Sequence, residues 1–325
     1  MQVQDYLSKE EIKTLTQKSD LKALFELCKT WGTILLTFLV VAWYPSVFTI
    51  VPALFILGGK QLACAIIMHD ASHRALFRAN AVNDWVGNWL GGYWVFSDTQ
   101  RYRPYHLKHH VNTGTHKDPD LSLTRGYPTT IKSFARKILR DLAGITGFKT
   151  QVGLFYINFG LVEFTAAGVL KKMNQTGRSL GQFILTGLRN YAGPLAVHAL
   201  LLGVLWAFGV AWLFALWVGA LLSTYNFSLR IRSMAEHSMV PDPLDNHRNT
   251  RTTYARWWEK LLFAPHHVNY HAEHHLLMTV PPYHLPKMHQ LLKTRGFYEE
   301  GILAQNYAQL IRQAMSGRPR VEKSH

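Results

Sequence analysis

Residues 191–229 read YAGPLAVHALLLGVLWAFGVAWLFALWVGALLSTYNFSL, a run of 39 residues without Asp, Glu, Lys or Arg. One helix needs about 20 apolar residues to cross the hydrocarbon core of a bilayer. The run is therefore long enough for two spans, with a reversal near Gly209. Two helices buried in a globular core are the alternative, but no polar face interrupts the run. We therefore expect an integral membrane protein with a transmembrane hairpin at 191–229.

A second apolar run lies nearer the N-terminus and predicts a second hairpin. Residues 30–59 carry no charged side chain, and residues 61–68 extend the run beyond Lys60. Trp43 and Pro45 mark the reversal, because aromatic side chains favour the membrane interface and proline ends a helix. Lys60 could extend its amine to the headgroups or line an internal tunnel, and we favour the headgroups. His198, inside the later run, is expected to be a hydrogen-bonded core residue.

The net charge of +15 is distributed unevenly and indicates the topology. Residues 101–149 contain ten Lys or Arg, Arg230 and Arg232 follow the later run, and neither hairpin tip is charged. By the positive-inside rule, both termini and the region between the hairpins face the cytoplasm. Attraction to an anionic membrane surface accounts for the charge, so no nucleic-acid partner is expected.

These features predict an all-α membrane fold of four transmembrane helices in two hairpins, with a cytosolic helical cap. The polar start MQVQDYLSKEEIK is unlike a cleavable signal peptide. Residues 150–170 are expected to lie in the interface, because a fifth span would separate the histidines described next. The predicted segments are a cytosolic leader at 1–30, the first hairpin at 31–68, a cytosolic and interfacial region at 69–190, the second hairpin at 191–229, a cytosolic region at 230–316 and a disordered tail at 317–325.

Histidines are the candidate metal ligands. The two cysteines, Cys28 and Cys64, lie far apart and suggest no disulfide or thiolate site. Spacings of three and four residues place imidazoles on one helical face, where they can chelate a metal. Nine of the seventeen histidines form four clusters beside the apolar runs: His69 and His73 in HDASH, His106, His109 and His110 in HLKHH, His237 in SMAEH, and His271, His274 and His275 in HAEHH.

The number of histidines indicates two metal ions. A tetrahedral zinc ion takes four ligands, whereas nine imidazoles would serve two ions with four or five nitrogen ligands each. Imidazole also suits copper and nickel, but a redox metal beside a lipid-derived substrate favours iron. The sequence therefore predicts a di-iron centre.

The clusters HDASH, HLKHH and HAEHH, in this order and with an apolar hairpin between the last two, resemble the histidine boxes of the membrane fatty acid desaturase family. The segments HHVNTGTHKDPDL (109–121) and APHHVNYHAEHHLLMTVPPYHLP (264–286) are especially similar to bacterial and acyl-lipid members. The resemblance spans nearly the whole chain. It implies a four-span di-iron enzyme, in a bacterial inner membrane, that removes two hydrogens from an acyl chain with O2 and two delivered electrons. It also implies that the nine clustered histidines are the iron ligands.

The residues around the boxes suggest further roles. Carboxylates commonly orient metal-bound imidazoles, and Asp70, Glu236 and Glu273 lie within the clusters. A solvated carboxylate or a salt bridge to a nearby Arg is an equal alternative for each. Asp118 and Asp120 flank Pro119, where a turn explains these residues at least as well as substrate contact does. Ser233 stands where some family members have an Asn ligand, and Asn226 and Asn269 are possible substitutes. The remaining nearby histidines are expected to be structural or hydrogen-bonding residues: His116, His247, His266, His267, His284 and His289.

The resemblance implies an acyl lipid or acyl thioester as substrate and a separate electron donor of the ferredoxin or cytochrome b5 type. No fused electron-transfer domain is visible in the sequence. The same centre in a hydroxylase, ketolase or oxidative decarboxylase is an alternative, although HxxxH followed by two HxxHH boxes favours a desaturase. A metal transporter would place ionisable groups within the spans, where only Lys60 and His198 occur.

Overall fold

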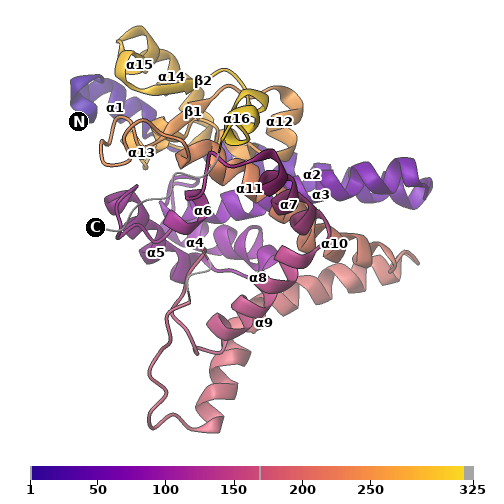
Figure 1. Ribbon diagram of the computed structural model, residues 1–325. Helices are drawn as coiled ribbons and strands as arrows, with labels where there is room; N and C mark the ends of the chain where they lie inside the picture. The colour runs from indigo at the N-terminus through magenta and orange to yellow at the C-terminus, as the bar shows by residue number, and fades with distance from the viewer. Residues whose placement is uncertain (1, 168–169, 318–325) are drawn as a thin grey trace.

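The computed structural model describes residues 2–167 and 170–317, and most of these residues are helical (Figure 1). Beyond residue 317, the tail predicted at 317–325 lies outside the described residues. Within the described ranges, three helices are long and apolar enough to cross a membrane: α2 (Asp20–Trp43), α3 (Val47–Ser72) and α9 (Leu180–Ala207).

The first predicted hairpin consists of α2 and α3. The chain reverses at residues 44–46, directly after Trp43, as the aromatic residues and Pro45 indicated. Both helices extend beyond the predicted limits of 31–68, because polar residues at each end continue the helical hydrogen bonding. Ser19 caps the start of α2 by accepting a hydrogen bond from the Lys22 amide at 3.4 Å.

Lys60 does not reach the headgroups, contrary to the expectation. Its side chain is buried, with 8 % of the residue exposed. The neighbouring Gly58 and Gly59 allow α11 (Thr224–His237) and α12 (Trp257–Leu262) to approach α3 closely. A Cβ on Gly59 would lie 2.5 Å from the Leu261 carbonyl oxygen. Tertiary packing therefore encloses this level of α3.

The second hairpin reverses at Gly209, whose φ of +71° suits glycine. Its first arm, α9, begins at Leu180 rather than at residue 191. The return arm is divided into α10 (Leu213–Leu222) and α11 (Thr224–His237). At the break, Asn226 Nδ2 donates to the carbonyls of Leu221 and Leu222 at 3.0 and 3.2 Å. A hydrogen-bonding side chain thus satisfies backbone groups that the interrupted helix leaves open.

The four apolar helices share one core. Phe38 of α2, Leu57 of α3, Leu205 of α9 and Trp217 of α10 belong to the same buried cluster. In Figure 1 the two reversals lie at the same end of the molecule, on the right of the view.

Shorter helices connect the hairpins. α8 has 14 residues and is about 21 Å long, less than the roughly 30 Å of the hydrocarbon core. Thus no helix in the described residues of 150–170 is long enough to span the membrane. The connecting elements are α4 (Asn80–Trp89), η2 (Gly92–Val95), α5 (Thr99–Asn112), α6 (Leu121–Thr124), α7 (Ile131–Leu142) and α8 (Ile145–Asn158).

The C-terminal region packs with the N-terminal leader (Figure 1). Leu7 and Leu15 are buried against Leu292 and Phe297. A short parallel pair, β1 (Arg251–Thr253) and β2 (Ile302–Ala304), is the one sheet in the described part of the chain and departs from the all-α expectation. The helices here are η1 (Val3–Asp5), α1 (Lys9–Leu15), α12 (Trp257–Leu262), η3 (Pro265–His267), α13 (His271–Leu276), η4 (Pro282–His284), α14 (Leu285–Thr294), α15 (Phe297–Glu300) and α16 (Tyr307–Ala314).

Candidate metal centre

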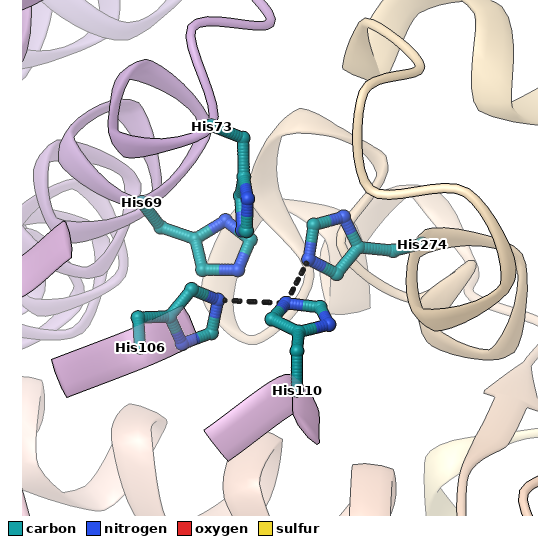
Figure 2. A group of neighbouring side chains, drawn as sticks. All are labelled: His69, His73, His106, His110 and His274. Atoms are coloured by element: carbon teal, nitrogen blue, oxygen red, sulfur yellow. Dashed lines mark hydrogen bonds between the residues drawn. The ribbon is translucent and has the colours of Figure 1, made fainter. Parts of the chain in front are cut away.

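The nine clustered histidines meet in two groups. In each group, one ligand atom from every residue lies within 4.8 Å of all the others. Figure 2 shows the rings of the larger group turned toward a common centre. The five-histidine group comprises His69, His73, His106, His110 and His274, and the four-histidine group comprises His109, His237, His271 and His275.

Helical spacing explains how two boxes contribute to both groups. On α5, His106 and His110 are four residues apart and enter the five-histidine group, whereas His109 enters the other. On α13, His271 and His275 enter the four-histidine group, and His274 enters the five-histidine group. Side chains four residues apart lie above one another on a helix, and the intermediate position points to a different side. Each HxxHH box therefore joins two adjacent centres.

The two groups touch each other. The His110 ring stacks on the His275 ring of the other group, with centroids 4.3 Å apart. Within the groups, the Nε2 atoms of His110 and His106 are 3.1 Å apart, and those of His271 and His237 are 2.8 Å apart. Facing ring nitrogens at these distances place several lone pairs around each centre.

Several buried nitrogens have no protein partner. His69 Nε2 and both ring nitrogens of His73 accept or donate no hydrogen bond within the described residues. Unpaired buried polar atoms are costly and rare in proteins. Converging imidazole nitrogens without partners are the donor set that a divalent transition metal prefers. The residues thus fit a pair of metal ions.

Oxygen atoms behind the rings orient three of the histidines. Nδ1 lies 2.8 Å from an Asp70 oxygen in His69 and 2.8 Å from an Asp118 oxygen in His109. In His237 it lies 3.2 Å from the Asn249 carbonyl. An acceptor at Nδ1 fixes the tautomer in which Nε2 offers its lone pair to a metal.

Of the three carboxylates predicted to orient clustered histidines, only Asp70 hydrogen-bonds one of them. Asp70 contacts a clustered histidine, whereas Glu273 hydrogen-bonds His289 Nδ1 at 2.5 Å and contacts Tyr298 and Thr252. Glu236 is 3.6 Å from His271 Nδ1 and accepts a hydrogen bond from Arg232.

From the sequence, Asp118 was explained at least as well by a turn as by substrate contact. The orienting role of the Asn249 carbonyl was missed. Asp118 has both a turn and an orienting role, since it also accepts the Gly114 and Asp120 amides. The Asp-Pro-Asp turn beside a box was the available signal for Asp118. No sequence signal marks a backbone carbonyl.

Burial keeps most of these imidazoles neutral. It lowers the pKa of His110 to about 2 and that of His237 to about 3. For His109, burial lowers the pKa, but the hydrogen bond that Nδ1–H donates to Asp118 raises the pKa above its ordinary value. Burial raises the pKa of Glu236 to about 7, although Arg232 acts in the opposite direction. Neutral imidazoles are the form that binds metals.

A cavity of about 510 Å³ reaches both groups. Its wall includes His69 and His106 from one group and His109, His237 and His271 from the other. Apolar residues from α3, α8 and α10, such as Ile66, Leu154 and Leu221, line it together with polar Tyr102, Arg232 and Ser233. The lining thus suits a largely apolar molecule with some polar groups that approaches both histidine groups.

Other residues named from the sequence lie outside the two groups. Asn269 Nδ2 donates to the Thr253 carbonyl at 2.9 Å, as Asn226 does to the end of α10. As expected, the remaining partnered histidines form hydrogen bonds elsewhere: His198 with Pro194, His247 with Tyr6, His266 with Thr30, His284 with Leu15 and His289 with Glu273. Cys28 and Cys64 are both free.

Comparison with known proteins gives matches over most of the chain. A family model described as fatty acid desaturase matches residues 19–307. The sn-1 oleoyl-lipid 12-desaturases of Picosynechococcus sp. and Synechocystis sp. are each 25 % identical to the chain over 82 % of its length, and it covers 77 % and 76 % of them. Dihydrorhizobitoxine desaturase of Bradyrhizobium elkanii is 26 % identical to this chain, and the matched region covers 74 % of this chain and 66 % of that protein. Because the family match includes all nine clustered histidines, the chain belongs to the fatty acid desaturase family of oxidoreductases.

Proposed function

We propose that the chain is a membrane acyl-lipid desaturase that introduces a carbon–carbon double bond into an acyl chain with O2 and two external electrons. The observation that carries this proposal is the pair of adjoining histidine groups that share one cavity. Two of the similar proteins are named for an oleoyl-lipid substrate, which supports an acyl lipid here.

The nine clustered histidines are the proposed ligands of two iron ions. Nine imidazoles exceed what one ion needs, and the division into five and four suits two ions. When bound, the iron would supply the redox chemistry that removes hydrogen from an unactivated methylene at the expense of O2.

The protein's own contribution is to position the histidine rings and the acyl chain and to exclude water from them. Asp70 and Asp118 hold the rings of His69 and His109, so that Nε2 of each faces its group. Tyr102 stacks on His106, with ring centroids 5.0 Å apart, and lines the cavity beside the histidines. A fixed wall keeps one carbon pair near the centre, and a misplacement of about 1 Å can cost roughly a hundredfold in rate.

The proposed topology has four spans, with residues 31–68 and 191–229 as hairpins. Residues 1–30, 69–190 and 230–316, with both termini and the metal centre, are proposed to face the cytoplasm. The ten basic residues at 101–149 support this side, as does the position of both reversals at one end of the molecule (Figure 1).

Expression in a host of known lipid composition tests the function. Total fatty acids would be compared by mass spectrometry with those of a His274→Ala, His275→Ala variant. We expect a new double bond with the wild type alone and about two iron ions per chain. A hydroxylated or shortened product without a new alkene would indicate a different reaction, and a wild type without iron would contradict the proposed centre.

A further inference from the structure

The proposed reaction requires electrons that neither substrate nor O2 supplies. Forming a double bond from two methylenes releases two hydrogens, and reducing O2 to two waters consumes four electrons and four protons. Two electrons and two protons must therefore come from outside. The two cysteines are free and lie on different helices, so the described residues hold no cluster that could store the electrons.

The metal-centre histidines are exposed on a side other than the cavity. The cavity wall includes five of the nine, and the other four are His73, His110, His274 and His275. His274 is buried, whereas His73, His110 and His275 are partly exposed. Their exposed edges therefore face solvent away from the cavity, which leaves one side for the substrate and another for electron entry.

A surface with an apolar centre and basic residues covers this second side. We call it the α5 surface and define it by Arg74, Leu107, Lys108, Val111, Lys117 and Leu244. Four of these residues directly adjoin clustered histidines in sequence, since Arg74 follows His73, Leu107 and Lys108 lie between His106 and His109, and Val111 follows His110.

Local packing joins the α5 surface to the four-histidine group. The Thr113 hydroxyl lies 3.4 Å from His275 Nδ1, and Asn249 Nδ2 donates to the Thr113 carbonyl at 3.4 Å. Gly114 packs directly on Pro243, which places Leu244 beside the end of α5. Helix α5 and the loop at 243–249 thus lie directly beside the partly exposed His275 of the four-histidine group.

The exposure and charge of the α5 surface fit a protein partner. Val111 is 83 % exposed and Leu244 is 70 % exposed, so the centre of the surface is apolar and open to solvent. Across residues 2–167 and 170–317, Arg74, Lys108 and Lys117 form no ion pair. Asp242 and Asp245 beside Leu244 carry two negative charges against the three positive charges of Arg74, Lys108 and Lys117, so these five side chains sum to +1. In Figure 1, α5 lies on the side away from the hairpin reversals, which disfavours the bilayer as its occupant.

We propose that the α5 surface is the docking site of an acidic one-electron carrier protein, an inference that rests on the proposed function. Two carrier molecules, each oxidised by one electron, would supply the two electrons, and two protons would come from solvent. Basic side chains around an apolar centre steer an acidic partner and suit a small, transient interface.

A double variant, Lys108→Glu with Lys117→Glu, tests the surface in the full-length protein in lipid nanodiscs. The probe is an acidic [2Fe–2S] ferredoxin, and the bypass is dithionite with methyl viologen, which needs no docking. We expect kcat/KM for ferredoxin to fall roughly tenfold or more at low salt, while viologen-driven desaturation and iron content stay unchanged. The matched control, Lys132→Glu with Arg136→Glu on α7, should keep both activities.

Two results would overturn the docking site. One is a double variant whose kcat/KM for ferredoxin equals that of the wild type. The other is an equal loss with both reductants and weaker vesicle attachment, which would indicate a membrane-facing surface. Ferredoxin binding by calorimetry separates this proposal from the function. Binding that depends on Lys108 and Lys117 in a wild type without desaturase activity supports the surface and contradicts the reaction, whereas absence of binding contradicts the surface.

Discussion

At the scale of single residues, Asp118 accepts the only hydrogen bond that the His109 ring forms among the described residues. We expect Asp118→Asn to weaken metal binding at the four-histidine group by roughly 10–100-fold, because the amide no longer sets the ring tautomer as the carboxylate does. Iron retained per chain during titration with a chelator measures the effect. Asp242→Asn is the control, since Asp242 accepts only a local amide in its turn. An unchanged chelator titration would contradict the orienting role.

Glu11 gives a pH-dependent contact between the leader and α14. Its hydrogen bonds with Arg295, at 2.7 and 2.5 Å, lower the pKa of Glu11 to about 2. Because the pKa of Glu11 is lower in the folded state, the ionised carboxylate stabilises the contact fully at a pH above its ordinary pKa of 4.5. This stabilisation is lost as the pH falls toward 2. Hydrogen exchange should therefore show stronger protection of α1 in the wild type than in Glu11→Gln at about pH 5, and similar protection at about pH 2.5. Equal protection at both pH values would refute this contribution.

At the scale of elements, one ion pair joins α7 to α11. Asp141 is fully buried and accepts hydrogen bonds from Arg230 at 2.5 and 2.9 Å. Arg230→Met leaves that carboxylate without its counterion, which should cost about 3–5 kcal/mol. Unfolding in detergent micelles measures the loss, and Lys132→Met on the exposed face of α7 is the control. Adding Asp141→Leu should restore much of the stability. A single variant as stable as the wild type would show that water or other groups compensate the carboxylate.

The hairpins show which elements could be predicted from the sequence. Both reversals depend on local chemistry, at Pro45 and at Gly209, and both were predicted. The start of α9 was not, because Arg189 ends the uncharged run although the helix already begins at Leu180. The break between α10 and α11 was also missed. It coincides with the close approach of Gly147 on α8 to Leu222, a contact between residues far apart in sequence.

At the scale of the whole molecule, the metal centre combines elements from both halves of the chain. The spacing within each box predicted which histidines would cluster. It could not predict the division into groups of five and four, because that division depends on how α3, α5, α11 and α13 pack together. The same packing separates the cavity from the α5 surface, so that substrate and electrons can reach the histidines from different sides.

The proposed topology can be tested by labelling single cysteines in intact cells. In a Cys28→Ala, Cys64→Ala background, cysteines introduced by Tyr44→Cys and Phe208→Cys mark the two reversals, and Lys117→Cys marks the α5 surface. Tyr44 and Phe208 are 63 % and 80 % exposed. A membrane-impermeant maleimide should label the two reversal positions from outside, and Lys117→Cys only after the membrane is permeabilised, because basic segments remain cytoplasmic. Labelling of Lys117→Cys in intact cells would reverse the assigned orientation. Labelling of one reversal but not the other would mean that one hairpin does not cross, and four spans would then be wrong.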